Sequence, residues 1–244
     1  MTPTIDYACT FDGHDLDEFF AVDYQMERRL PTWEPSLVDV PARSGAIFGG
    51  TRATPVTIGM RLVVLERFRD RRQELLRMLA GWLAVDEPKR LVLGDEGGRY
   101  RLAVPTDEAP ITPYLNGDVV EVYFTCPDPL LHGETRTATV PSGGTATIRV
   151  GGTAPTAPRV TASATGGASG WTLTMPNGGI HADIPNGTTR GDVADCAART
   201  LTVGGSVAML APAYDWPTLA PGENVLTMTA GTGAATIEWE ELWW

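Results

Sequence analysis

Apolar and polar residues alternate along short runs in the second half of the chain, and glycine-rich turns separate these runs. Alternation sends successive side chains to opposite faces of a strand, while Asn-Gly and Gly-Gly pairs are typical of tight turns. Helical periodicity is missing from this region, so the pattern predicts a β-sandwich. The predicted strands are residues 135–140, 145–150, 159–164, 171–175, 179–184, 200–203, 222–230 and 234–239.

The first half of the chain contains one segment with a helical period. Over residues 67–83, apolar side chains recur at intervals of three, four and seven, which predicts an amphipathic helix. The apolar face consists of Phe68, Leu75, Leu79, Trp82 and Leu83. The opposite face holds Arg69, Arg71, Arg72, Glu74 and Arg77. We interpret this charged face as solvated, with an anionic contact as the alternative.

Strand-like runs surround the predicted helix. They contain β-branched residues, alternate in part and end at turn residues such as Asn-Gly. These runs are residues 56–65, 90–93, 99–104 and 118–125. We therefore predict a mainly β protein in which the first half adds one packed α-helix.

A change in composition divides the two halves. Residues 1–133 carry 14 basic and 21 acidic side chains, whereas residues 134–244 carry 5 and 9 and are richer in glycine and threonine. Pro127 and Pro129 lie close to this change, and proline interrupts the continuation of a sheet. We predict an N-terminal domain at residues 1–133 and a C-terminal domain at residues 134–244.

Charge and cysteine content exclude several classes of protein. A net charge of −11 repels phosphate, so sequence-specific nucleic-acid binding is not expected. No apolar run approaches the roughly 20 residues that span a bilayer, and the N-terminal residues lack a signal-peptide pattern, so we expect a cytoplasmic protein without membrane insertion. Cys9, Cys126 and Cys196 are widely spaced, which favours buried thiols over disulfides or a zinc site.

Catalytic chemistry finds little support in the sequence. The chain has no nucleophile elbow, phosphate-binding loop, dinucleotide fingerprint or His-Glu-x-x-His helix. The acidic residues 12–18 fail the calcium-loop spacing because Gly13 comes too early, which favours a solvated turn. Glu238 and Glu240 alternate with Trp239 on one predicted strand, which favours a charged strand over a pair of catalytic acids. We predict no catalytic residue, cofactor or metal, and hence no enzyme.

The tryptophans raise the alternative of a carbohydrate-binding module, because indole rings stack on sugars. Trp171 and Trp239 fall within predicted strands, so core packing is the first interpretation. Trp243 and Trp244 leave two alternatives open: either they fold back onto the chain or they contact a partner.

Four segments, in this order, carry a resemblance to a known family. They are residues 43–50 (RSGAIFGG), 120–129 (VEVYFTCPDP), 151–158 (GGTAPTAP) and 216–226 (WPTLAPGENVL). Together with the helix between the first two segments, this order resembles the distal tail proteins of long-tailed bacteriophages and prophages, the siphovirus tail components.

The resemblance implies an N-terminal β-sandwich that forms a hexameric ring and a C-terminal galectin-like β-sandwich outside it. Such a ring connects the tail tube to the tail hub or tail-associated protein and lets DNA and the tape-measure protein pass. It implies a place at the virion tail tip, after assembly in the host cytoplasm. Short loops leave no room for an inserted carbohydrate-binding module, so we predict a connector; a module for host surface glycans is the alternative.

The glycine-rich residues 43–51 suit an interface between ring subunits. The suspected interface residues are Arg43, Gly45, Ile47, Phe48 and Gly49, and the alternative is an ordinary hairpin loop. The suspected partner contact is formed by Trp243 and Trp244.

Overall fold

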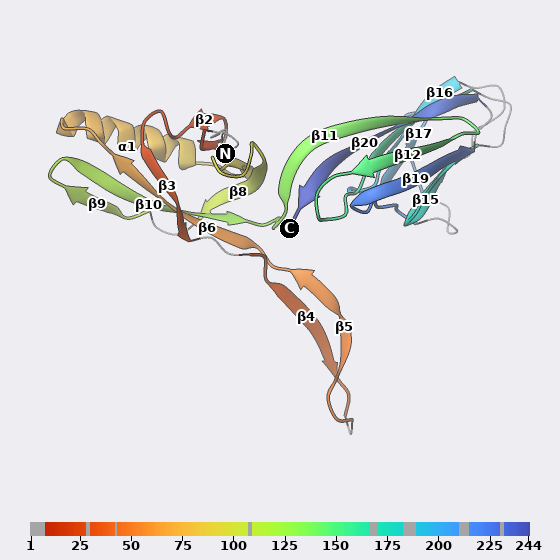
Figure 1. Cartoon of the computed structure of the whole chain (residues 1–244), viewed down its shortest axis with the longest axis horizontal. Coiled ribbons are helices and arrows are strands. Elements are labelled where there is room, and N and C mark those ends of the chain that lie inside the picture. Colours follow the sequence, from red (N-terminus) through yellow and green to blue (C-terminus); the bar gives the residue numbers. More distant parts are fainter. Residues whose placement is uncertain are drawn as a thin grey trace, which may run out of the picture. The chain divides into compact units, whose positions relative to one another are not determined.

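The computed structural model describes residues 8–27, 30–41, 43–106, 109–165, 170–182, 189–209, 215–229 and 232–244. The chain divides into two compact units, residues 1–131 with Trp244 (unit 1) and residues 132–243 (unit 2) (Figure 1). Strands dominate both units and unit 1 carries a helix, so the prediction of a mainly β protein with one packed helix is confirmed.

The larger sheet of unit 1 is built around two long antiparallel strands. Strand β6 (Val56–Val64) pairs with β10 (Gly117–Cys126) along its whole length, and β3 (Ala21–Glu27) pairs with the other edge of β6. Alternate residues of β6 and β10 are buried, and the remaining ones are half-buried or lack a side chain. Strand β9 (Ile111–Tyr114) pairs with the beginning of β10.

Strand β8 (Tyr100–Thr106) joins this sheet to a second one. Its residues 100–103 pair with β7 (Lys89–Val92), whereas its residues 104–106 pair with β10. The second sheet continues from β7 to β1 (Thr10–Phe11) and β2 (His14–Asp15). The two sheets share one buried apolar cluster, in which the rings of Phe11 and Phe124 lie 4.8 Å apart between centroids.

Helix α1 (Arg69–Leu83) begins two residues later than the sequence predicted and contacts the unit 1 core through Leu79. One charged residue was misplaced by the prediction. Arg72 does not lie on the solvated face: its Nε lies 3.3 Å from Asp118 Oδ2, and the two side chains are 12% and 6% exposed. This largely buried ion pair ties the start of α1 to the start of β10. Arg69, Arg71 and Arg77 are exposed, as predicted.

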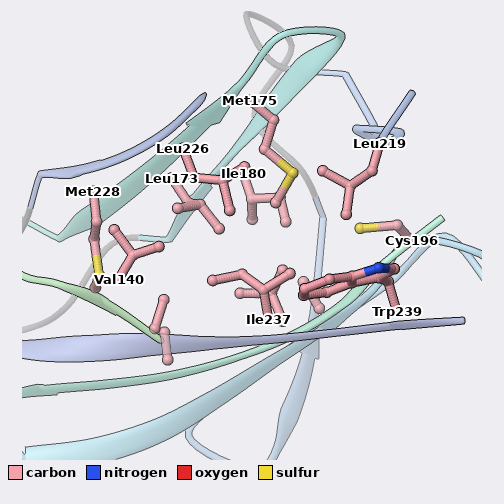
Figure 2. Packing of buried hydrophobic residues seen from close by; sticks show 14 of the residues in the cluster. Val140, Leu173, Met175, Ile180, Cys196, Leu219, Leu226, Met228, Ile237 and Trp239 are labelled. Atoms are coloured by element: carbon pink, nitrogen blue, oxygen red, sulfur yellow. The ribbon is translucent and has the colours of Figure 1, made fainter. Parts of the chain in front are cut away.

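Unit 2 is a sandwich of two antiparallel sheets. One sheet has the order β18-β17-β16-β13-β20-β11 and the other has the order β12-β19-β14-β15. Side chains from both sheets fill the space between them (Figure 2). The strands are β11 (Leu131–Pro141), β12 (Thr145–Val150), β13 (Arg159–Thr165), β14 (Trp171–Met175), β15 (Gly178–Ala182), β16 (Thr189–Asp195), β17 (Thr200–Val203), β18 (Ser206–Ala208), β19 (Gly222–Thr229) and β20 (Thr232–Trp243).

A buried hydrogen bond links the two sheets of unit 2. Trp171 Nε1 on β14 donates to Asp192 Oδ2 on β16 at 2.9 Å, and Asp192 Oδ1 accepts from the Gly204 amide at 3.0 Å. Trp171 and Asp192 are 0% and 1% exposed, so the indole belongs to the core, as predicted. Trp239 is also buried, which confirms the same prediction for that residue.

The sequence prediction missed strands β1, β2, β3, β9, β16 and β18 and the hairpin described below. Strand β9 contains Pro113 and is exposed throughout, so it has no buried face to produce alternation. Residues 183–184 and 230, predicted at the ends of two strands, lie outside the described residues. Along the described part of the chain, no helix has the length and apolar character needed to cross a membrane.

Candidate assembly surface

A two-stranded hairpin forms the strongest candidate for an assembly surface. Among the residues that the structure describes, strands β4 (Trp33–Asp39) and β5 (Ala46–Ala53) pair only with each other, and they extend away from the sheets of unit 1 (Figure 1). The base is closed at Thr54, whose amide and Oγ1 both donate to the Thr32 carbonyl, at 2.9 and 3.2 Å. The chain therefore enters and leaves the hairpin at one point.

A bulge divides the hairpin into a base and a tip. The register between β4 and β5 shifts between Pro35 and Leu37, where Gly49 and Gly50 of β5 lie opposite the single residue Ser36 of β4, so the extra residue is on β5. Within the bulge, a Cβ on Gly49 would lie 3.3 Å from Ser36 Oγ, and Gly50 has φ of +119°. Both positions therefore favour glycine, and bulges bend a strand and increase its twist.

The tip exposes apolar side chains on both of its faces. Leu37 pairs with Phe48 and Val38 pairs with Ile47, and consecutive pairs of an antiparallel ladder point to opposite faces. These side chains are 60%, 63%, 54% and 43% exposed, in the order given. Exposed apolar area on both faces of a narrow hairpin indicates a surface that another molecule covers.

The charges of the hairpin balance one another. At the base, Arg52 Nη2 and Nε donate to Glu34 Oε2 at 2.8 and 3.0 Å, and both side chains are largely exposed. At the tip, Asp39 and Arg43 are exposed. The hairpin is thus nearly neutral within a chain of net charge −11, which reduces the repulsion between copies at this place.

The suspected interface residues of the sequence analysis all lie in this hairpin. Ile47 and Phe48 point to opposite faces of β5, and Arg43 is exposed in the segment before it. Gly45 has φ of +78°, a conformation that glycine adopts without strain, and Gly49 makes room for Ser36. The two glycines therefore shape the hairpin and present no side chain of their own.

Sequence reasoning missed the apolar residues of the opposite strand. Leu37 and Val38 stand between Pro35 and Pro41, a run without alternation that did not predict a strand. If this segment had been paired as an antiparallel hairpin with the residues after Gly45, Leu37 and Val38 would have been placed opposite Phe48 and Ile47.

The two final tryptophans both contact the chain itself. The Trp243 ring lies against Gly133, where an added Cβ would clash with it. The Trp244 ring is edge-to-face with the ring of Trp33, at 4.5 Å between centroids, and Trp244 is 40% exposed. A contact of these residues with a partner stays a prediction.

The acidic side chains that the sequence analysis considered as candidate sites make hydrogen bonds within the fold. In the acidic turn, Asp17 Oδ2 accepts from the Cys9 amide at 2.6 Å, and Asp15 Oδ1 accepts from the Asp17 amide at 2.9 Å. On β20, Glu240 Oε2 lies 2.8 Å from Nδ1 of His132. Among the residues that the structure describes, no group of three or more His, Cys, Asp or Glu side chains is placed to hold a metal ion.

The three cysteines are buried thiols, as the sequence predicted. Burial is the largest cause that raises the pKa of Cys9, Cys126 and Cys196, each to about 12. Neighbouring carboxylates add to the increase at Cys9 and Cys196. Thiols with such pKa values remain protonated at neutral pH and are poor nucleophiles.

Comparison with known protein families identifies two domains in the chain. The phage tail protein RIFT-related domain matches residues 14–126, and the siphovirus-type tail component, C-terminal domain matches residues 151–243. This chain belongs to the siphophage distal tail (Dit) family. The family segments quoted above therefore lie in a siphovirus tail component, a structural protein of phage tails.

The crystal structure of SPP1 Dit (gp 19.1) agrees in fold with this siphovirus tail component, with a TM-score of 0.75 and 18% sequence identity, covering 96% of this chain and 98% of that chain. A chain of the phage P2 baseplate in its activated conformation with Ca has a TM-score of 0.42 and 9% identity, covering 92% of each chain. No curated protein sequence matches the chain.

Proposed function

We propose that this distal tail protein forms a closed hexameric ring that connects the tail tube to the tail hub and lets DNA pass. The observation that carries the proposal is the β4–β5 hairpin, whose tip exposes apolar side chains on both faces. A ring of identical subunits repeats one head-to-tail contact, in which a surface of each copy binds a different surface of the next. A projecting apolar hairpin is suited to be one of these surfaces.

Residues 1–133 form the ring in this proposal, and residues 134–244 surround it. The partners are the tail tube protein, the tape-measure protein and the tail hub or tail-associated protein, in a virion tail tip assembled in the host cytoplasm. The acidic balance of the chain supports passage of DNA without sequence-specific binding, because like charge keeps the phosphates from adhering. The function is structural and not enzymatic.

Binding of host glycans is the less favoured alternative. Sugar stacking needs an exposed aromatic face, but Trp171 and Trp239 are 0% and 6% exposed, and Trp216 packs against the same core. Among the described residues of unit 2, the large apolar side chains that are exposed are Val207, Met209 and Val225, none of which is aromatic. We expect no sugar-competed binding of the chain on glycan arrays.

The mass of the chain in solution tests the ring. Light scattering after size exclusion is measured over a concentration series, alone and with the tail tube protein of the same phage, and the largest species is imaged by negative stain. We expect a mass of six copies and ring-shaped particles. A single-copy mass under every condition would contradict the proposal.

A pair of matched variants connects the ring to the hairpin. Ile47→Glu places a charge on one face of the tip and should raise the concentration for half-assembly at least about tenfold, since desolvating an unpaired carboxylate is costly. Val207→Glu, on an exposed strand of unit 2, is the control and should assemble like the unmodified chain. Equal assembly of both variants would remove the hairpin from the interface.

A further inference from the structure

We propose that the hairpin tip of one copy binds the apolar end of unit 1 in the next copy, formed by Leu65, Phe68, Tyr114 and Leu115. This inference rests on the ring proposed above and assigns the second of its two contact surfaces. The four side chains are 75%, 66%, 60% and 92% exposed, in the order given. The occupant is the tip defined by Leu37, Val38, Ile47 and Phe48 of a second copy.

Three elements bring the receiving residues together. Leu65 follows β6, Phe68 is the N-cap of α1, Tyr114 ends β9, and Leu115 begins the turn from β9 to β10. The start of α1 and this turn lie at the same end of unit 1 (Figure 1), where the Arg72–Asp118 ion pair fixes the helix to β10. The surface therefore rests on paired strands and on a helix, not on a loose loop.

A glycine separates two of the receiving side chains. Tyr114 pairs with Gly117, and a Cβ built on Gly117 would lie 4.0 Å from Leu65 Cδ2 and 2.6 Å from the Val64 carbonyl oxygen. A side chain at residue 117 would therefore meet the backbone of Val64, and glycine allows the start of β10 to pack closely against the end of β6 between Leu65 and Tyr114.

The distribution of exposed apolar side chains selects these two surfaces. Within the described residues of unit 1, the large and exposed apolar side chains that lie outside the hairpin strands are Phe19, Leu30, Leu65, Phe68, Ile111, Tyr114, Leu115 and Trp244. Leu30 lies two residues before Thr32 at the hairpin base, and the Trp244 ring packs on Trp33. The Phe19 ring packs on Trp82, at 5.7 Å between centroids. The rest lie at the receiving end or, like Ile111, on the strand that leads to it. A ring interface needs two different complementary surfaces per copy, and the described part of unit 1 offers these two.

The local charges also favour contact between the hairpin tip and the apolar end of unit 1. Two copies of net charge −11 repel, and the acidic turn at residues 12–18 strengthens the repulsion there. Near Phe68, however, Arg67, Arg69 and Arg71 outnumber Glu66 and Asp70, and all three arginines are exposed. The hairpin tip carries Asp39 next to Val38, with Arg43 beyond it. A docked tip can therefore place Asp39 by an arginine and Arg43 by an acid.

Crosslinking between two single-cysteine variants tests the docking directly. Phe48→Cys and Leu115→Cys are prepared separately, mixed under assembling conditions and oxidised with copper phenanthroline, which takes up the two electrons released when the thiols join. The native thiols are buried, so the introduced ones react. We expect a disulfide-linked pair of chains in the mixture and little in either variant alone, since only the mixture brings a tip thiol to an end thiol. Phe48→Cys mixed with Val207→Cys is the control.

A charge variant supplies an independent measurement. Leu115→Glu changes a side chain that is 92% exposed, so its folding should be unaffected, and we expect the concentration for half-assembly to rise at least about tenfold. If rings form but the mixture gives no crosslink and Leu115→Glu assembles normally, the docking is wrong and the ring stands. If the unmodified chain forms no ring even with the tail tube protein, the proposed function fails and this inference fails with it.

Discussion

The β4–β5 hairpin and the β6–β10 pair are built from similar residues but use them in opposite ways. In β6, Ile58, Met60 and Leu62 point into the core and are at most 3% exposed. In the hairpin tip, Ile47 and Phe48 point to opposite faces, and both are exposed. A strand whose apolar residues share one face buries them within the chain, whereas a hairpin with apolar residues on both faces leaves them exposed, and we propose that a second copy covers them.

Thiol reactivity should give the largest contrast between the two regions. A pKa of about 12, against the ordinary 9.0, makes the thiolate fraction of Cys9, Cys126 and Cys196 about a thousandfold lower at pH 8. We expect Phe48→Cys to be alkylated at its new thiol while the native thiols stay unmodified until the chain is unfolded, as read by mass spectrometry. Rapid modification of a native thiol would show that its core opens readily.

The same pKa values predict a loss of stability at alkaline pH. Between about pH 9 and pH 12 the thiols ionise in the unfolded chain but stay protonated in the native chain. The unfolded state then binds fewer protons, so the free energy of unfolding should fall as the pH rises through this range. Chemical denaturation at a series of pH values measures it, and Cys196→Ala, which removes one such group, should reduce the slope.

Removal of a core indole should have the next largest effect. Trp171→Ala leaves a cavity between the sheets of unit 2 and takes one hydrogen-bond donor from buried Asp192, so we expect a loss of about 3–5 kcal/mol in the free energy of unfolding. Trp33→Ala, at the hairpin base, is the control and should cost less than about 1 kcal/mol, because Trp33 is 48% exposed. Equal losses in urea titrations would contradict the assignment of Trp171 to the core.

A buried amide in unit 2 should contribute less. Asn224 is 1% exposed and closes its turn by accepting from the Ala220 amide at 3.1 Å and donating to the Ala220 and Gly222 carbonyls at 2.7 and 3.2 Å. Asn224→Ala leaves these groups without the side chain, and we expect a loss of about 1–3 kcal/mol. The neighbouring Val225→Ala, 52% exposed, should change stability by less than about 0.5 kcal/mol.

The smallest effect on folding is expected at the hairpin tip. Phe48→Ala should change the free energy of unfolding of dilute chains by less than about 0.5 kcal/mol, because the side chain is 63% exposed. Phe124→Ala, the buried counterpart on β10, should cost about 3–5 kcal/mol. If Phe48→Ala proved as destabilising as Phe124→Ala, the tip would pack on its own chain, and the contrast between an exposed tip and a buried core would be wrong.

Alternation of apolar and polar residues was sufficient to predict a strand where that strand has one buried face. Strands β12, β14 and β17 occupy the residues that the pattern predicted, since each places alternate side chains in the sandwich. The pattern missed β4, whose side chains are exposed on both faces and which contains Pro35. It also misplaced Arg72, because periodicity cannot foresee that Asp118, distant along the chain, neutralises the charge.

The sequence identified only one of the two strands that form the candidate assembly surface. The glycine-rich segment before and after Ile47 indicated an interface, but Leu37 and Val38 became part of it only through strand pairing. The receiving end assembles residues from β6, α1 and the β9–β10 turn, so it has no signature along the chain. What covers either surface depends on a second molecule, which a single sequence does not contain.

Strands β3 and β6 pair directly with each other, and the hairpin between them begins and ends at the contact of Thr32 with Thr54. Substitutions between these two threonines should therefore disturb the folding of unit 1 less than substitutions in the core strands do. If the tip makes the ring contact proposed above, a change there alters which subunits assemble together while the fold stays the same, so the hairpin would act as a mark of self-recognition between subunits.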